Sequence, residues 1–360
     1  MYANGIEKVE IELTTRCNAS CPQCSRNYFG GKVWPTLPIV DLKLSVLKEK
    51  LSKSFLSTLK QIDLIGTYGD PCIHKDLIAI VTWIHESTDA KIVISTNGSL
   101  RSTDWWHKLG STLRSQDRVL FGIDGLEDTN HLYRKGTNFK KIIANMTAFN
   151  NAGGKSIWSY VVFQHNEHQI DKAKKLSEEL NCYGFAVKPT NRFVNKQHNL
   201  IENFPVVNKN GKTIYWLQPP TNTAYINPGY KKYKGLNEGP GDYNNYLKNT
   251  QIDCFGVKIK YVVISAEGYV FPCGWLQDRL YGYEAESHPD RQRLLDLIEK
   301  SGGFDSINIR YKSVTEILAG DFFKSIKDSW TNEYRLDRCA NQCGAHNLFG
   351  ASYNNIKELL

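Results

Sequence analysis

Residues 9–24 read VEIELTTRCNASCPQC, and this stretch decides how the rest of the chain is interpreted. The β-branched and apolar residues of 9–13 predict a short strand. Three cysteines, Cys17, Cys21 and Cys24, follow at C-x3-C-x2-C spacing in the loop after that strand. Three thiols in one loop can converge on a single inorganic centre, so the sequence predicts a metal or cluster site at the carboxyl end of the first strand.

The number of thiols limits which centre this loop can hold. Three thiolates underfill a tetrahedral zinc site, which would need a fourth ligand from elsewhere. A cubane iron–sulfur cluster held by three thiolates instead keeps one iron open for a substrate or cofactor. The remaining interpretation, three incidental buried cysteines, is disfavoured by this spacing in a βα loop.

The first 190 residues alternate between short apolar runs and longer helix-like stretches. Units at a spacing of about 30 residues indicate parallel βαβ repeats, which wind in a right-handed series into a full or partial barrel. Six units predict an α/β fold, an open, partial (β/α)6 TIM-like barrel over residues 1–190. The expected strands are 9–13, 62–66, 91–95, 119–123, 157–163 and 185–188, with helices within 41–59, 76–86, 139–151 and 167–180.

Two further regions follow the predicted barrel. Residues 191–250 lose all periodicity and are rich in Asn, Tyr, Pro and Gly, which fits either an unstructured insertion or linker, or a substrate lid. In residues 251–360, the runs 258–265 and 269–272 flank Ala266-Glu267-Gly268 and predict a hairpin. The stretch 313–316 has a capping-box pattern and opens a helix to about residue 330. These elements predict a small α+β unit.

Four cysteines flank the hairpin and the helix of this last region. Cys254, Cys273, Cys339 and Cys343 can close one all-thiolate site, and the chemistry alone allows structural zinc or an iron–sulfur cluster. The two remaining cysteines, Cys72 and Cys182, are interpreted as small buried hydrophobes.

Composition narrows the class of protein. With 360 residues, 41% of them hydrophobic, the chain is globular and large enough for one large domain or two modest ones. No apolar run is long enough for a membrane helix, and the N-terminus lacks a secretory signal, so we expect a cytoplasmic protein. Nine cysteines, an odd number, then argue for metal and against a disulfide framework. The net charge of +8 suits an anionic partner, but without a long Lys/Arg run nucleic acid is not expected.

The C-x3-C-x2-C loop after the first strand of a partial barrel resembles the radical S-adenosylmethionine (radical SAM) superfamily. The resemblance implies that Cys17, Cys21 and Cys24 hold a [4Fe-4S] cluster whose open iron is chelated by SAM. One electron would split SAM into methionine and a 5′-deoxyadenosyl radical, which takes a hydrogen atom from the substrate. The sequence departs from the family at Gln23, where relatives often carry an aromatic residue.

Further strand ends extend the resemblance. Residues 66–71, Gly-Thr-Tyr-Gly-Asp-Pro, look like the family's Gly-Gly-Glu-Pro element, although Tyr68 and Asp70 replace a glycine and the glutamate. Many relatives carry a serine where this chain has Gly122. The strand-end residues Asp124, His165 and Lys188 are candidates for a general base, but none is assigned; taken singly, the strand-end polar residues are also explained as turns or helix caps. The SAM contacts implied by the resemblance are Tyr68, Gly69, Asp70, Pro71, Asn97, Asp124 and Arg134.

The C-terminal cysteines carry a second resemblance. Cys254, then thirteen residues, Gly268, four residues and Cys273 resemble the first half of a SPASM or twitch auxiliary-cluster domain. A full SPASM domain carries seven cysteines, so the four found here imply the shorter twitch type, with one fully ligated [4Fe-4S] cluster.

The resemblance implies an oxidoreductase that modifies a peptide or protein oxidatively. The alternatives are dehydrogenation of a small polar metabolite and, in a different class, a non-catalytic zinc-stabilised binding module. The basic surface would suit an acidic flavodoxin or ferredoxin that delivers the electron.

Overall fold

The central element of the computed structural model, which describes residues 1–2, 5–190, 193, 201–226, 243–281 and 288–345, is one eight-stranded sheet. Its strand order is β10-β9-β1-β2-β3-β4-β5-β6, and β1 to β6 pair in parallel in chain order. The predicted α/β class is therefore confirmed, and all six predicted strands are present. They are β1 Lys8–Ile11, β2 Gln61–Leu64, β3 Lys91–Thr96, β4 Arg118–Gly122, β5 Ser156–Val162 and β6 Gly184–Pro189.

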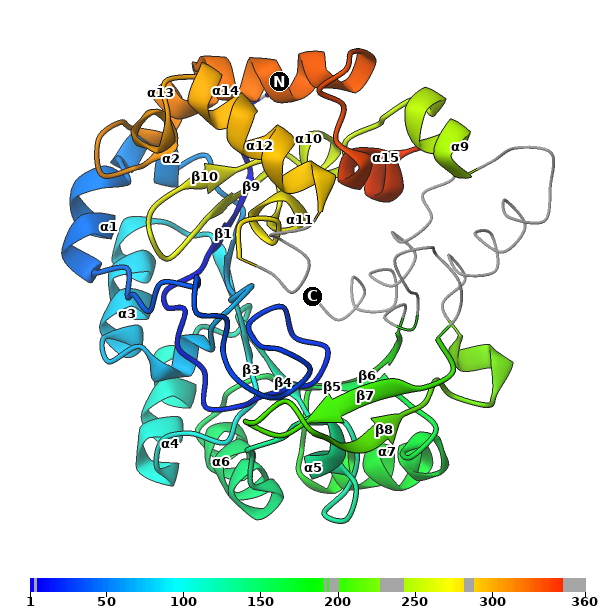
Figure 1. The fold of residues 1–360 in the computed structure, drawn as a ribbon. Helices are drawn as coiled ribbons and strands as arrows, with labels where there is room; N and C mark the ends of the chain where they lie inside the picture. Colours follow the sequence, from blue (N-terminus) through cyan, green and yellow to red (C-terminus); the bar gives the residue numbers. More distant parts are fainter. Residues whose placement is uncertain (3–4, 191–192, 194–200, 227–242, 282–287, 346–360) are drawn as a thin grey trace.

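Helices follow the strands and cover the outside of the curved sheet (Figure 1). The expected helix within 41–59 is divided in two, because Leu51 is extended and Ser52 starts a new helix by accepting a hydrogen bond from the Phe55 amide (3.2 Å). The helices of this half are α1 Leu44–Lys50, α2 Lys53–Leu56, α3 Leu77–Ser87, α4 Thr103–Thr112, α5 Asn130–Tyr133, α6 Phe139–Asn151 and α7 Ile170–Glu179.

Both faces of the sheet are buried, which explains why its strands are apolar almost throughout. On the outer face, Trp106 of α4 packs against Phe121 of β4 and Phe149 of α6. On the inner face, one residue from each of four neighbouring strands forms a separate buried cluster of Val93, Leu120, Ile157 and Ala186. The sheet is therefore a packed scaffold, and its carboxyl edge presents the loops.

The C-terminal hairpin extends the same sheet. β9 (Tyr261–Ile264) pairs in parallel with β1, and β10 (Val270–Phe271) pairs antiparallel with β9. Gly268 in the predicted turn has φ of +97°, a conformation that favours glycine. Chain segments more than 200 residues apart are thus hydrogen-bonded neighbours. The domain boundaries at 190 and 250 stay a prediction.

Seven further helices lie in the C-terminal part that the structure describes. The predicted capping box of Ser313 and Glu316 is present, but the helix it opens ends at Gly320, where a second helix begins. These helices are α9 Tyr243–Asn249, α10 Phe255–Lys258, α11 Gly274–Gln277, α12 Pro289–Lys300, α13 Val314–Ala319, α14 Asp321–Asp328 and α15 Asp337–Cys343.

Part of the region interpreted as an insertion, linker or lid is an ordered hairpin. β7 (Phe204–Val207) pairs antiparallel with β8 (Thr213–Leu217). The helix α9 (Tyr243–Asn249) also falls in this region, whereas residues 191–192, 194–200 and 227–242 lie outside the described residues. None of the described helices has the length and apolar character needed to span a bilayer.

The buried carboxylate of Asp117 joins three elements at the amino edge of the sheet, and its removal should destabilise the fold. It accepts hydrogen bonds from the backbone amides of Ile92 (2.7 Å) and Arg114 (2.8 Å), and its Oδ2 lies 2.8 Å from His85 Nε2. We expect Asp117→Ala to lower the free energy of unfolding by about 2–3 kcal/mol in chemical denaturation, because buried donors lose their acceptor.

The matched control is Asp89→Ala, whose exposed carboxylate makes one ion pair with Arg114 at 3.6 Å. We expect this control to change stability by less than about 0.5 kcal/mol. Equal losses in the two variants would contradict the assignment of Asp117 as a structural anchor.

Candidate cofactor site at the carboxyl edge of the sheet

The three N-terminal thiols lie in the loop that leaves the carboxyl end of β1. Cys17, Cys21 and Cys24 are each half-buried. The Cys24 amide donates to the Cys21 carbonyl (3.0 Å), and the Ser20 amide donates to the Lys135 carbonyl (2.8 Å), which attaches the loop to the segment after α5. These bonds fix the loop that carries the three cysteines at the carboxyl end of β1, whereas the predicted cluster site stays a prediction.

The surroundings of these thiols favour a bound centre over three free thiolates. Burial raises the pKa of Cys21 to about 11, although the neighbouring Arg134 guanidinium opposes this. Burial also raises the pKa of Cys17, and the negative charges of Asp70, Cys21 and Cys24 raise it further. Three thiolates in one buried loop would repel one another, and a cationic iron–sulfur core would offset that repulsion.

The buried carboxylate of Asp70 organises the end of β3. It accepts hydrogen bonds from the Thr96 hydroxyl (2.9 Å), the Asn97 backbone amide (2.8 Å) and Asn97 Nδ2 (2.7 Å). It also accepts one from the Cys72 amide (3.0 Å) and so caps the 3₁₀ turn Pro71–Ile73. The carboxylate oxygens of Asp70 thus fix the end of the neighbouring strand β3 by hydrogen bonds.

Asn97 links the Asp70 hydrogen-bond network to the thiol loop. Its Nδ2 donates to Asn18 Oδ1 (2.8 Å) and lies 3.8 Å from Cys17 Sγ. Its Oδ1 accepts from the Ser99 amide (2.9 Å), so both ends of the side-chain amide are held. Sequence reasoning selected Asn97 but missed Asn18 and Thr96, which no local motif distinguishes from ordinary turn residues.

A second charged network joins β4 to Cys21. The Asp124 carboxylate is fully buried and accepts from Arg134 Nε (2.5 Å) and from the Val161 amide (2.6 Å). Arg134 Nη1 in turn lies 3.9 Å from Cys21 Sγ. With its Nε held by Asp124, the guanidinium directs its terminal nitrogens to the thiol loop, where an anionic ligand can meet them.

Gly122 makes room for this arginine. A Cβ atom added at position 122 would lie 2.5 Å from Arg134 Nη2. A serine at this position would therefore collide with the guanidinium as it is placed here. The absence of a side chain at position 122 and the position of Arg134 therefore depend on each other.

The 66–71 turn lies against the start of the thiol loop. A Cβ atom on Gly69 would fall 1.7 Å from the Thr14 carbonyl oxygen, so only glycine fits. The Asp70 amide donates to the Arg16 carbonyl (2.8 Å), and Pro71 starts the 3₁₀ turn. The Tyr68 side chain is buried and donates to the Gln277 carbonyl (3.0 Å). A cofactor contact by Tyr68 would therefore involve its backbone.

The β7–β8 hairpin covers the Cys21 side of the site. Lys135 Nζ donates to the carbonyls of Gly30 (2.8 Å) and Val207 (2.7 Å), which ties the hairpin to the thiol loop. The Tyr215 hydroxyl donates to the Leu132 carbonyl (2.8 Å). The hairpin's inner residues share an apolar cluster with Tyr133 and Phe163, against which Cys21 packs. Sequence reasoning missed Lys135 and Tyr215, whose partners lie far along the chain.

The two remaining candidate bases, His165 and Lys188, are not among the side chains described above that approach the thiols. His165 follows β5 and stacks on Phe163 with ring centroids 5.3 Å apart, and burial lowers its pKa to about 4. It is thus a neutral imidazole near pH 7. Lys188 lies within β6.

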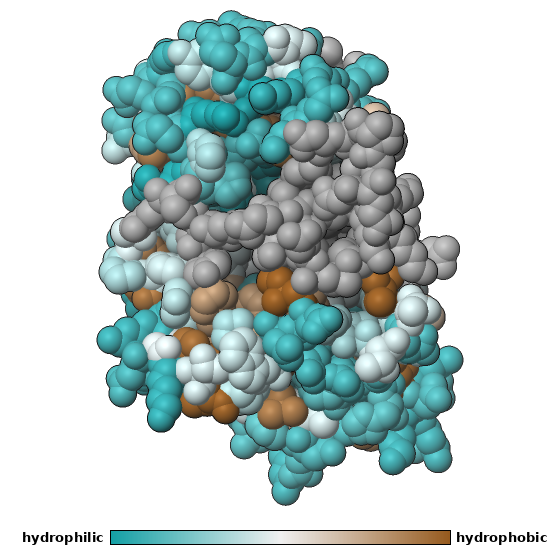
Figure 2. All heavy atoms as spheres, turned by 45° about the vertical axis from the view of Figure 1, so that its right-hand side comes forward, coloured by the Kyte–Doolittle hydropathy of each residue, from teal (hydrophilic) through white to brown (hydrophobic). Residues whose placement is uncertain are grey.

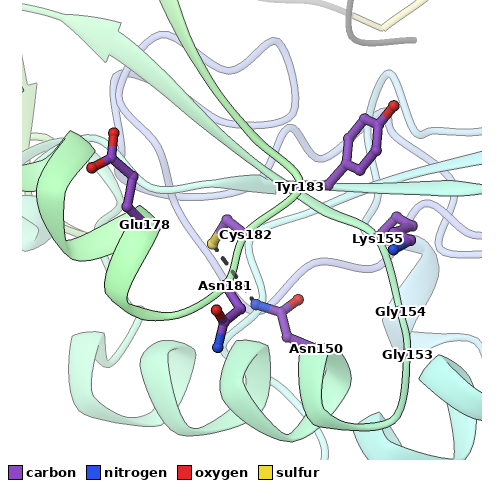
Figure 3. Close-up of a pocket in the computed structure, with 8 residues that line it drawn as sticks. All are labelled: Asn150, Gly153, Gly154, Lys155, Glu178, Asn181, Cys182 and Tyr183. Carbon is purple, nitrogen blue, oxygen red and sulfur yellow. Dashed lines mark hydrogen bonds between the residues drawn. The ribbon is translucent and has the colours of Figure 1, made fainter.

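A surface cavity lies at the opposite, amino edge of the sheet (Figure 3). It contains Cys182, to whose sulfur Asn150 Nδ2 comes within 3.8 Å, and is bordered by residues that precede β5 and β6. The predicted site residues of the carboxyl edge do not line it. The other leftover cysteine, Cys72, is fully buried in the main core.

The four C-terminal thiols line one small cavity. Cys254 and Cys273 immediately precede α10 and α11, whereas Cys339 and Cys343 lie one turn apart on α15. A hydrogen bond from Cys343 lowers the pKa of Cys254, so these two thiols are in contact. The wall also includes Trp275, Trp330, Arg338 and Gln342.

Helix α15 is anchored so that its two thiols face this cavity. The fully buried Asp290 carboxylate accepts from the amides of Asp337 (2.8 Å) and Arg338 (2.7 Å) at the start of the helix.

Within the described part of the chain, no three His, Cys, Asp or Glu side chains are arranged to hold a single metal ion.

The packing of Gly122 against Arg134 can be measured by a double-mutant cycle. We expect Gly122→Ala to destabilise the protein in thermal unfolding, because the added methyl group displaces the guanidinium from Asp124. In an Arg134→Ala background the same change should cost less than about 0.5 kcal/mol, giving a coupling of about 1 kcal/mol or more. Additive effects would show that position 122 does not constrain Arg134.

Comparison with known proteins agrees with this geometry. Residues 11–176 match the Radical SAM superfamily. The fold is similar to anSMEcpe with bound AdoMet (14% identity, TM-score 0.55, 98% of this chain and 92% of that one) and with bound AdoMet and Cp18Cys peptide (15%, 0.52, 98% and 95%).

A third similar structure is Streptococcus suis SuiB bound to the precursor peptide SuiA, at 15% identity and a TM-score of 0.48. That match covers 75% of this chain, which spans about 60% of the length of SuiB. The thiol loop, Asp70, Asn97, Asp124 and Arg134 all lie within residues 11–176, the range that matches the Radical SAM superfamily.

Proposed function

We propose that this chain is a radical SAM enzyme that cleaves SAM reductively and uses the resulting radical to modify a peptide or protein oxidatively. The proposal rests on one observation: the hydrogen-bonded networks around Asp70 and around Asp124 both reach the same thiol loop. Asn97 Nδ2 lies 3.8 Å from Cys17 Sγ, and Arg134 Nη1 lies 3.9 Å from Cys21 Sγ. An amide and a cation thus approach two of the three thiols of the loop, which supports a site for an anionic ligand there.

Cys17, Cys21 and Cys24 would hold a [4Fe-4S] cluster there. When bound, the cluster supplies the electron that splits the sulfonium of SAM. The chain's own residues would bind and orient SAM. Arg134 would offer its terminal nitrogens to the SAM carboxylate, while Asp124 holds that guanidinium by its Nε. The turn at 66–71 offers backbone groups for the amino end of SAM. The β7–β8 hairpin shields the Cys21 side from water.

The second cluster is proposed from the C-terminal cavity. Cys254, Cys273, Cys339 and Cys343 supply four thiolates around one small space, and the Arg338 guanidinium in its wall would offset their negative charge. Arg338 Nη2 pairs with Asp278 Oδ2 at 3.7 Å, whereas its buried Nε has no hydrogen-bond partner among the described residues and would be able to face an anionic cluster. Four thiols can hold either structural zinc or a [4Fe-4S] cluster, and the cluster is proposed because the cysteine spacing resembles a twitch-type centre, which has no open iron.

A peptide or protein substrate is supported by the surface beside the site. On β8, Ile214 and Trp216 are 48% and 56% exposed, although their neighbours Tyr215 and Leu217 turn inward. Apolar side chains gather in the lower half of the face shown in Figure 2, the half in which β7 and β8 lie. Exposed apolar residues of this kind suit contact with a polypeptide. The similar fold of anSMEcpe has been seen with a bound peptide.

The electron would come from a flavodoxin or ferredoxin. Such donors are acidic, and the net charge of +8 on this chain favours their association at low ionic strength.

Metal analysis tests both clusters at once. Anaerobically reconstituted protein should contain about eight iron atoms per chain, for two [4Fe-4S] clusters. Replacing Cys17, Cys21 and Cys24 by alanine should leave about four, and so should replacing Cys273 and Cys339. Zinc together with about four iron atoms in the unmodified protein would reject the auxiliary cluster alone.

Reductive cleavage of SAM tests the catalytic proposal. With dithionite, the reconstituted protein should form 5′-deoxyadenosine, and Cys21→Ala should abolish it because the cluster loses a ligand. Cys182→Ala, at the opposite edge of the sheet, is the matched control and should keep the activity. An unmodified protein that carries iron but releases no 5′-deoxyadenosine would overturn the proposed function.

A further inference from the structure

Glu12, the first residue after β1, lies fully buried between two parts of the molecule that carry the two predicted sites. Its Oε1 accepts hydrogen bonds from the backbone amides of Tyr68 (2.6 Å) and Gly69 (3.1 Å) in the 66–71 turn. Its Oε2 accepts from Gln277 Nε2 (2.5 Å). One carboxylate thus holds the turn on one side and α11 on the other.

Gln277 is the matching group on the C-terminal side. It is 1% exposed and ends α11, four residues after Cys273. Besides its bond to Glu12, its backbone carbonyl accepts from the Tyr68 hydroxyl (3.0 Å), and its Oε1 accepts from the Thr67 hydroxyl (3.4 Å). Three hydrogen bonds therefore join Gln277 to Glu12 and to the turn.

Neither end of this link can move alone. The backbone amides of Leu276 and Gln277 both donate to the Cys273 carbonyl (3.2 and 3.3 Å), so the whole of α11 is one rigid turn beginning at that cysteine. At the other end, Gly69 is pressed against the Thr14 carbonyl so closely that no Cβ fits. A shift of Cys273 would therefore act on the 66–71 turn through α11 and Gln277.

We propose that Glu12 and Gln277 are positioning residues that couple the Cys273 segment to the 66–71 turn, so that the state of the C-terminal thiol site alters SAM binding at the N-terminal one. The inference deepens the proposed function and rests on it for the identity of the ligand. Both residues act through the turn and α11, and neither touches a thiol. The coupling follows a continuous chain of hydrogen bonds between two buried side chains.

The pair can be broken by one substitution and restored by a second. Gln277→Glu puts a second carboxylate where Gln277 now donates, so two buried carboxylates face each other. In the exchanged pair, Glu12→Gln with Gln277→Glu, the new glutamine still accepts from Tyr68 and Gly69 and donates to the new glutamate. That glutamate keeps an oxygen for the Thr67 hydroxyl. The exchange conserves charge and every donor–acceptor match.

Two measurements report on the coupling. The first is amide hydrogen exchange in residues 66–71, with α4 as an internal reference, and the second is the affinity of the reconstituted protein for SAM. We expect Gln277→Glu to speed exchange in the turn and to weaken SAM binding, each by about tenfold, and the exchanged pair to return both to within about threefold of the unmodified protein. Gln292→Glu, on the exposed side of α12, is the matched control and should change neither.

The outcomes separate the inference from the proposed function. Unchanged exchange in residues 66–71 of a folded Gln277→Glu variant would overturn the coupling, and so would an exchanged pair as damaged as the single variant. An unmodified protein that binds no SAM, with turn exchange behaving as expected, would overturn the proposed function and leave the link in place. If Gln277→Glu does not fold, Gln277→Ala removes the donor without adding charge and should speed turn exchange by about threefold, an absent effect again overturning the coupling.

Discussion

The parallel pairing of β1 with β2 on one side and β9 on the other is the constraint on which the site depends. A strand with two hydrogen-bonded neighbours cannot shift its register without breaking both ladders. The chain therefore leaves β1 at a defined height, and the thiol loop begins there. The ends of β2, β3 and β4 reach the same edge because they run parallel to β1.

Buried charge then decides the fine arrangement at that edge. Asp70 and Asp124 are both buried carboxylates that would be costly without partners, and each is satisfied by donors from a neighbouring strand end. Their partners, Asn97 and Arg134, are the side chains that approach the thiol sulfurs. The residues nearest the thiols are thus held by a second layer of buried acids, and Glu12 acts in the same way on the 66–71 turn.

Agreement between sequence and structure is closest where a short range of residues contains the whole physical cause. Alternating strands and helices identify all six strands, and α6 covers the expected 139–151. Agreement is weaker where a cap interrupts a favourable run, as Ser52 does between α1 and α2 and Gly320 between α13 and α14.

The sequence by itself determined the α/β class and the strand order of the first half, because periodicity and loop position are local properties. The grouping of the cysteines into three, four and two stays a prediction from their spacing. Only the tertiary structure decided that the C-terminal hairpin joins β1, that Gly122 yields its space to Arg134, and that Lys135 fastens the β7–β8 hairpin to the thiol loop. It also decided that Glu12 meets Gln277, 265 residues away. Each of these contacts joins residues far apart along the chain, and their energy arises from burial and hydrogen-bond satisfaction, which exist only once the chain has folded.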